Sequence, residues 1–349
     1  MRKGLCVILV LALALCMGAC QSAPGAEKKE LVIFTWSDYL PQETLDAFTA
    51  ETGIEVIYTY FDSNDEMLTK LDAVDGGEYD LVLASDYAID IARKQGLTQK
   101  LDKSVITRFG DIDPVFQSKF FDPDNEYTVP FAAGTPLIVY DPAKVSIDIT
   151  GYESLWDPSL EDSIVLIDDA RVILGVTLIS MGYTMNETDP EIIQAAGDKL
   201  LQMKGNIRAL DYNTPHELMI SGETAVGFMF TPQAYWAITE RPDLEICYPK
   251  EGMGFGIDAF FIPSNAPHAE EANLFLNYIL DGETSAYLSE FTQYMNCVTT
   301  AKEYLPESYF NEVLYIPDEV LGNTQFVEDV GTEAQSLYAD QWTRFKNES

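Results

Sequence analysis

The sequence predicts an α/β protein of two lobes, each a mostly parallel sheet flanked by helices, joined by hinge crossovers. The chain has 349 residues, and at roughly 150 residues per domain about two domains are expected. Short apolar runs typical of buried strands alternate with segments of helical periodicity, and this alternation occurs twice. Two long β-prone stretches, 127–140 and 254–263, indicate that the chain crosses from one lobe to the other and back.

The segments of the first predicted lobe follow the order strand, helix, strand, helix, strand, which is typical of parallel strands with right-handed crossovers. Pro41 is suited to the start of the first helix and Gly53 to its end. A second set of strands and helices begins after Pro142. The predicted strands are 31–34, 54–60, 80–84, 164–167, 206–210 and 224–230, and the predicted helices are 41–50, 65–74 and 171–181. We expect lobe I to comprise 30–132 plus 259–310, and lobe II 133–258 plus 311–349.

The N-terminus has the pattern of an export signal. Arg2 and Lys3 precede an apolar run of about a dozen residues, which is too short to span a bilayer. The small residues that follow end at Cys20, and 17–20 resembles the bacterial lipobox, in which cleavage precedes a cysteine that receives lipid. We therefore expect a signal peptide at 1–19 and a lipidated Cys20 with a polar tether at 20–29. An ordinary secretory signal cut near Ala23 stays open. Either way the protein is exported, and the lipid would hold it at the periplasmic or extracellular face of the cell membrane.

Charge and cysteine content narrow the possible functions. The chain has 57 acidic and 21 basic residues, a formal net charge of −36, so it would repel nucleic acid and we expect no nucleic-acid partner. Beyond the signal and the lipidated Cys20, Cys247 and Cys297 remain, and we favour two buried thiols, although export would permit a disulfide between them. With two histidines and no Cys-x-x-Cys pair, we expect no metal site and no cofactor.

Candidate site residues follow from a rule for open α/β sheets, in which ligands bind beyond the carboxyl ends of the strands. Aromatic, hydroxyl and carboxylate side chains follow the predicted strands 31–34, 80–84 and 164–167. Asp258 stands alone in an apolar stretch, where a carboxylate is costly unless it is paired. These candidates are Trp36, Ser37, Asp38, Tyr39, Ser85, Asp86, Tyr87, Asp168, Asp169 and Asp258.

Aromatic walls combined with carboxylates predict a site for an organic cation. Charge-assisted hydrogen bonds would hold each ammonium group, and ring faces would add cation–π attraction. Each position also has a structural interpretation: the tyrosines could pack in the core, Asp38 and Asp86 could cap helices, and Asp168 could lie in a solvated turn.

Motifs of catalysis do not occur in the chain. There is no Gly-x-Ser-x-Gly elbow, phosphate loop or His-Glu-x-x-His sequence, and the two histidines are expected at the surface. We therefore expect no enzymatic activity. A surface-anchored hydrolase that uses Asp169 or Asp258 as general base stays open as a further alternative.

Several motifs occur in the order seen in bacterial spermidine/putrescine-binding proteins, and the sequence resembles that family from about residue 30 to 344. The resemblance implies a periplasmic-binding-protein-like fold and a role as the extracytoplasmic receptor of an ABC importer, in which two lobes close over a polyamine. The motifs are Thr35-Trp36-Ser37-Asp38-Tyr39, Glu51-Thr52-Gly53-Ile54-Glu55-Val56, Tyr79-Asp80-Leu81-Val82, Asp168-Asp169-Ala170-Arg171 and Pro249-Lys250-Glu251-Gly252.

The resemblance also implies roles for individual residues. Asp169 and Asp258 would hold ammonium groups, and Trp36, Tyr39 and Tyr294 would form aromatic walls. The remaining implied contacts come from Ser37, Asp38, Ser85, Tyr87 and Phe230.

The chain departs from the family pattern at four positions. Val172 replaces an acid, Phe230 and Gly256 replace tryptophans, and Val327 replaces a glutamine. We predict a monomeric lipoprotein that captures putrescine, spermidine or a related small amine by hinge closure and delivers it to the permease of an ABC importer. A receptor for a different class of small molecule is the alternative, because the departures could have emptied the polyamine site.

Overall fold

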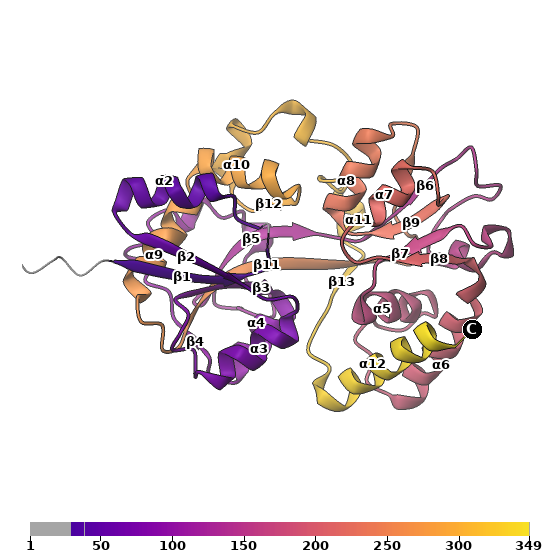
Figure 1. Ribbon diagram of the computed structural model, residues 1–349, viewed down its shortest axis with the longest axis horizontal. Helices are drawn as coiled ribbons and strands as arrows, with labels where there is room; N and C mark the ends of the chain where they lie inside the picture. The colour runs from indigo at the N-terminus through magenta and orange to yellow at the C-terminus, as the bar shows by residue number, and fades with distance from the viewer. Residues whose placement is uncertain (1–28, 38, 349) are drawn as a thin grey trace, which may run out of the picture.

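The computed structural model describes residues 29–37 and 39–348. In this part of the chain two β-sheets lie side by side, and helices cover both faces of each sheet (Figure 1). The predicted signal peptide, Cys20, most of the tether and Asp38 lie outside the described residues. No helix among the described residues is long and apolar enough to cross a membrane.

The first sheet is built around three parallel strands and two antiparallel ones. Its strands are β1 (Glu30–Thr35), β2 (Glu55–Tyr60), β3 (Leu81–Ser85), β4 (Thr98–Gln99), β5 (Thr128–Gly134), β11 (Met253–Pro263), β12 (Met295–Asn296) and β13 (Thr324–Phe326). They lie in the order β12-β5-β11-β3-β1-β2, with β4 and β13 also pairing with β11. β1 is parallel to β2 and β3, whereas β11 is antiparallel to β3 and β5.

The second sheet repeats this plan with a shorter set of strands. Its strands are β6 (Leu137–Tyr140), β7 (Ile164–Leu166), β8 (Ile207–Leu210), β9 (Val226–Met229) and β10 (Glu245–Cys247). They lie in the order β10-β6-β9-β7-β8. β7 is parallel to β8 and β9, and β6 is antiparallel to β9 and β10.

Both sheets are therefore mixed, which confirms the predicted α/β class but corrects the expectation of mostly parallel sheets. The parallel expectation holds for β2-β1-β3 and for β8-β7-β9. It fails where the chain passes between the sheets, because β5 leaves the first sheet in one direction and β11 enters it in the opposite one. Because β5 and β11 run in opposite directions and lie side by side in the first sheet, they pair as antiparallel strands.

Helices cover the sheets as strand–helix–strand connections require. Around the first sheet lie α2 (Gln42–Thr52), α3 (Asn64–Ala73), α4 (Asp86–Lys94), α9 (Ala269–Ile279) and α10 (Gly282–Thr292). Around the second lie α5 (Ala170–Ser180), α6 (Pro190–Gln202), α7 (Pro215–Ile220), α8 (Thr231–Glu240) and α12 (Gly331–Asn347), and the short α11 (Asp318–Leu321) lies in the last connection. Gly53 ends α2 with φ +74°, a left-handed conformation that favours glycine, as the sequence predicted.

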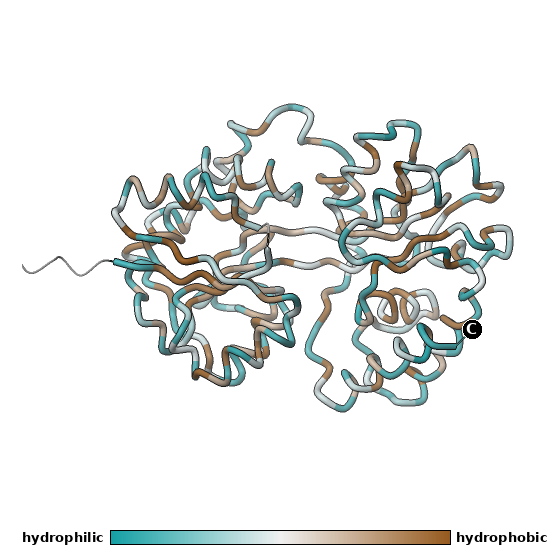
Figure 2. Tube along the Cα trace, viewed as in Figure 1, coloured by the Kyte–Doolittle hydropathy of each residue, from teal (hydrophilic) through white to brown (hydrophobic). Residues whose placement is uncertain are grey.

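Apolar side chains fill the space between sheets and helices. Figure 2 shows hydrophobic segments concentrated along the strands and hydrophilic ones along the outer loops and helices. Phe34 and Phe260 in the first sheet and Phe228 in the second are almost completely buried, and burying such a side chain contributes roughly 1.5–3 kcal/mol. Cys247 and Cys297 are buried free thiols in separate apolar clusters, which confirms the favoured prediction.

The connections between the sheets are tied to one another. The stretch 127–140 contains β5 in the first sheet and β6 in the second, with Thr135 between them. The Thr135 hydroxyl donates to the carbonyl of Gly254 at the start of β11. Its backbone N–H donates to Oγ1 of Thr231 at 2.9 Å, and Thr231 donates back to the Thr135 carbonyl at 2.8 Å. These bonds fix the relative position of the two passages.

Candidate functional site

A cavity of about 1050 Å³ lies between the two sheets. The parallel strands β1, β2 and β3 of one sheet and β7 and β8 of the other all end at it, since residues that follow each of these strands line its wall. Every described candidate from the sequence lines this cavity. They are Trp36, Ser37, Tyr39, Ser85, Asp86, Tyr87, Asp168, Asp169, Phe230, Asp258 and Tyr294.

Asp258 is a half-buried carboxylate on β11 whose hydrogen-bond partners are hydroxyl groups. Tyr39 donates to its Oδ2 at 2.8 Å and Ser85 donates to its Oδ1 at 3.0 Å. Asn64 in turn donates to the Ser85 hydroxyl at 3.2 Å, which orients it toward Asp258. Burial raises the pKa of Asp258 from 3.8 to about 6, although the two hydroxyl bonds oppose this shift.

Aromatic rings surround this carboxylate. The rings of Trp36 and Tyr39 have centroids 5.0 Å apart, and Tyr294 lies 6.1 Å from Tyr39. Tyr58 donates to the Trp36 carbonyl at 2.6 Å, which holds the loop after β1 in place. Burial and the neighbouring Asp258 raise the pKa of Tyr39 well above 10.0, so its hydroxyl keeps its proton and remains a donor.

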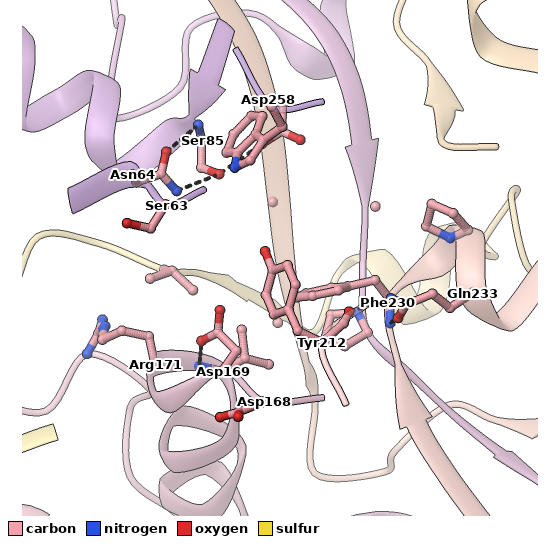
Figure 3. Close-up of a pocket in the computed structure, with 18 of the residues that line it drawn as sticks. Ser63, Asn64, Ser85, Asp168, Asp169, Arg171, Tyr212, Phe230, Gln233 and Asp258 are labelled. Atoms are coloured by element: carbon pink, nitrogen blue, oxygen red, sulfur yellow. Dashed lines mark hydrogen bonds between the residues drawn. The ribbon is translucent and has the colours of Figure 1, made fainter. Parts of the chain in front are cut away.

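A second carboxylate approaches the cavity from the opposite sheet. Asp169 is the N-cap of α5, and its Oδ1 accepts from the Val172 N–H at 2.9 Å. Burial raises the pKa of Asp169, whereas hydrogen bonds from the backbone N–H groups of Val172 and Arg171 and the positive charge of Arg171 lower it. In Figure 3, Asp168, Asp169 and Arg171 lie across the cavity from Asn64, Ser85 and Asp258.

Asp168 has a different environment from the solvated turn that was one interpretation of the sequence. Trp342 of the C-terminal helix donates to its Oδ1 at 2.8 Å, and Lys346 forms an ion pair with it at 3.1 Å. Its charge is therefore balanced from within the protein, in contrast to that of Asp258.

The cavity wall carries a large excess of negative charge. The described residues that line it include two with a full positive charge, Arg171 and Lys346. Lys346 pairs with Asp168, and Arg171 donates to Asn186 at 3.0 Å while its guanidinium lies 4.3 Å from the Tyr338 ring centre. Within the described chain, neither forms an ion pair with Asp258. The acidic lining residues are Asp62, Asp65, Asp86, Asp168, Asp169 and Asp258.

Tyr212 is the main wall residue that the sequence analysis missed. Its ring meets that of Phe230 edge to face at 5.9 Å. The Gln233 side chain stabilises this wall: its amide nitrogen donates to the Tyr212 carbonyl at 2.8 Å and its amide oxygen accepts from the Phe230 N–H at 3.0 Å. Tyr212 and Asn64 follow the ends of β8 and β2, so the same strand-end rule would have found both.

The four departures from the family pattern all lie in or beside this cavity. Val172, Phe230, Gly256 and Val327 line it. A side chain added at Gly256 would project into open space, since no atom lies within 4 Å of the position of its Cβ. This glycine widens the cavity beside Asp258.

His216 was expected at the surface, but it is half-buried and lines the cavity. Its Nδ1 is buried without a hydrogen-bond partner in the described structure, and burial lowers its pKa. The described residues contain no group of three or more His, Cys, Asp or Glu side chains that could hold a metal ion.

Comparison with known proteins establishes the family. A profile described as bacterial extracellular solute-binding protein matches residues 43–312. The chain belongs to this family. The spermidine/putrescine-binding periplasmic protein of Escherichia coli K12 is 35% identical to this solute-binding protein over 337 residues, which is 96% of each chain. The corresponding protein 1 of Haemophilus influenzae is 30% identical, over 93% of this chain and 91% of its own.

A solved structure agrees with this assignment. The substrate-binding protein of a spermidine/putrescine ABC transporter from Streptococcus pneumoniae is 32% identical, with a TM-score of 0.80 over 91% of this chain and 98% of its own. The resemblance predicted from the sequence and the two-lobed α/β architecture are thereby confirmed. Membership of a solute-binding family also confirms the prediction that this protein is not an enzyme.

Proposed function

We propose that this solute-binding protein is the polyamine receptor of an ABC importer and that putrescine, spermidine or a related small amine binds in the cavity between its sheets. The observation that carries the proposal is Asp258, a half-buried carboxylate held by two hydroxyl groups and surrounded by aromatic rings. Relatives at 30–35% identity are spermidine/putrescine-binding proteins, which supports the same ligand class.

An ammonium group is the partner that this arrangement lacks. It would donate charge-assisted hydrogen bonds to Asp258 while the faces of Trp36, Tyr39 and Tyr294 contribute cation–π attraction of roughly 0.5–2 kcal/mol each. Micromolar affinity requires only about −8 kcal/mol, which a few such contacts supply after the cost of ordering the ligand. A diamine could place its second ammonium at Asp169 on the opposite wall.

The two ends of the ligand would then contact different lobes. Asp258 and Tyr39 belong to the side of the first sheet, whereas Asp169 and Phe230 belong to the side of the second. A ligand held by both carboxylates favours closure of the lobes about the passages near Thr135 and Gly254, because only the closed form makes both sets of contacts. This division follows the predicted lobes I and II, except that it assigns Asp258 to lobe I, because β11 pairs with β3 and β5 of the first sheet. The receptor acts as a monomer.

Attachment to the membrane is the second part of the proposal. The lipobox-like segment 17–20 supports lipidation of Cys20, which would keep the exported receptor beside its permease. Metabolic labelling with a radioactive fatty acid tests it: wild-type protein should incorporate the label and a Cys20→Ser variant should not. Release of unlabelled wild-type protein into the medium would contradict the anchor.

A receptor for another small molecule is the alternative that one observation favours. Gly256 leaves space beside Asp258, so the cavity could hold a bulkier ligand of a different class than an unbranched polyamine.

Thermal-shift screening separates these ligands, since a receptor is stabilised only by what it binds. Putrescine, cadaverine, spermidine, amino acids and sugars are tested with wild-type protein, Asp258→Asn, and Asp124→Asn as a control at an exposed turn. Stabilisation by amines in wild type and the control, but not in Asp258→Asn, is expected. Stabilisation only by a neutral or anionic compound would contradict the proposal.

A further inference from the structure

We propose that Asp86 is a positioning residue for the ligand-binding wall, holding Asp258 and Tyr87 in place and adding its negative charge to the same end of the cavity. This role, which rests on the proposed amine-binding function, extends the site to a residue with no direct ligand contact. The Asp86 side chain is 2% exposed, so it acts through the groups to which it is bonded.

Asp86 lies directly after the last residue pair between β3 and β11. In the antiparallel ladder of β3 and β11, Ser85 lies opposite Asp258. Immediately beyond this pair, Oδ2 of Asp86 accepts from the backbone N–H of Ile257 at 3.1 Å. The Asp86 carboxylate thus accepts from the Ile257 N–H in place of a backbone carbonyl that a longer β3 would have offered. This bond holds the part of β11 that precedes Asp258 against the end of β3.

The second oxygen of Asp86 is bonded to the other wall element. Oδ1 accepts from the Tyr87 N–H at 2.8 Å, in the first turn of α4. Tyr87 lines the cavity. One side chain therefore joins the helix that presents Tyr87 to the strand that presents Asp258.

Helix capping, the alternative interpretation of Asp86 from the sequence, does not account for the bond to Ile257. The N-cap of α4 is Ser85, and Asp86 is the first helical residue. A capping side chain would use its oxygens on N–H groups of its own helix, whereas Oδ2 of Asp86 reaches a strand 171 residues away in the sequence.

The position of Asp86 beside Asp258 also gives it an electrostatic effect. Burial raises the pKa of Asp86, the Ile257 and Tyr87 N–H groups lower it, and the charges of Asp258 and Glu328 raise it again. The groups that interact with this pair of acids are the hydroxyls of Tyr39, Ser85, Tyr212 and Tyr294, the Cys297 thiol and the carboxylate of Glu328. No described lysine or arginine is paired with either acid. An ammonium group bound at Asp258 would interact favourably with the ionised form of either acid and so favour its ionisation.

The test is calorimetry of putrescine binding from pH 5 to 8 with wild type, Asp86→Asn and Asp90→Asn. Asp90 is a matched control, since it is a buried aspartate of the same helix that pairs with Arg93 and Lys94. Asparagine offers one acceptor oxygen for two N–H groups, so Asp86→Asn should weaken binding at pH 7.5 by at least about fivefold. Protonation of either acid weakens attraction to the ammonium, so wild-type affinity falls on acidification, and this fall should be shallower in Asp86→Asn.

A second variant covers the case in which Asp86→Asn folds poorly. Asp86→Glu keeps the charge and displaces the oxygens, so it should weaken binding while retaining the wild-type pH dependence. Wild-type affinity in Asp86→Asn, or equal weakening in Asp90→Asn, would overturn the positioning role, and an unchanged pH slope in Asp86→Asn would overturn the electrostatic one. Absence of amine binding by wild type would instead overturn the proposed function together with this inference.

Discussion

Replacement of Asp258 with asparagine should change ligand affinity and protein stability in opposite directions. The substitution keeps the size of the side chain and removes its charge. Tyr39 and Ser85 can still bond to the amide, because the Ser85 hydroxyl can turn to accept from it. The substitution removes from the unliganded protein the half-buried carboxylate at position 258, which forms no ion pair with a described basic residue.

The pKa of Asp258 gives the size of the stability effect. A carboxyl group with a pKa of about 6 in the folded protein, against 3.8 ordinarily, is destabilised in its ionised form by about 3 kcal/mol, at roughly 1.4 kcal/mol per tenfold change. Allowing about 1 kcal/mol for a less favourable hydrogen bond, the variant should gain roughly 1–3 kcal/mol in unfolding free energy at pH 7.5. Because the folded pKa is raised, the wild-type carboxyl group is most favourable below pH 3.8 and loses stability as the pH rises through about 6. The advantage of the variant should therefore vanish near pH 4.

The affinity of the Asp258→Asn variant for amines should decrease. Loss of a charge-assisted bond of about 1.5–3 kcal/mol weakens putrescine binding by roughly ten- to hundredfold. Calorimetric titration and thermal unfolding of the same preparations, with Asp124→Asn as control, measure both quantities. A variant that is merely misfolded would lose stability as well as affinity. Unchanged affinity would remove Asp258 from the site.

Three further predictions concern pH, stability and cavity shape. Wild-type affinity for putrescine should fall about tenfold from pH 7.5 to pH 5, because Asp258 takes up a proton with a pKa of about 6; a flat calorimetric profile would contradict this. The His268 imidazole bonds to buried Asp80 at 3.0 Å, which raises its pKa above 6.5. This stabilisation is complete below pH 6.5 and is lost as the pH rises through the raised value, so the thermal midpoint of wild type should decline more between pH 6 and 8 than that of His268→Gln, and equal declines would refute it. Gly256→Trp should fold normally and bind spermidine roughly two- to thirtyfold more tightly, since the side chain enters open space and adds a ring face of about 0.5–2 kcal/mol; weaker binding in calorimetry would indicate that the ligand occupies that space.

The strand-end rule explains how much of the site could be predicted. Trp36, Tyr87 and Asp169 follow parallel strands, and the carboxyl ends of those strands converge on one cavity. The rule depends only on local periodicity, which the sequence contains. Asn64 and Tyr212 lie four and two residues beyond the ends of β2 and β8, so the rule covers both of them as well.

Contacts that depend on strand register could not be predicted. Ser85 meets Asp258 because β3 and β11 pair antiparallel across 173 residues of sequence, and no local pattern specifies that register. The mixed sheets were missed for the same reason. The local pattern identified β11 as a strand but contained nothing about the direction in which it enters the first sheet.

Asp258 and Asp86 show why some proposed site residues can be recognised from the sequence and others cannot. Asp258 was recognisable because a carboxylate in an apolar strand contradicts the pattern around it, and such a local conflict is retained where function requires it. Asp86 follows a strand and begins a helix, where an aspartate agrees with local rules, so the sequence pattern could not separate a cap from a positioning residue. The difference appears only when the second oxygen is traced to Ile257. A residue that breaks local rules can therefore be found from sequence, whereas one that satisfies them while serving a distant strand requires the three-dimensional structure.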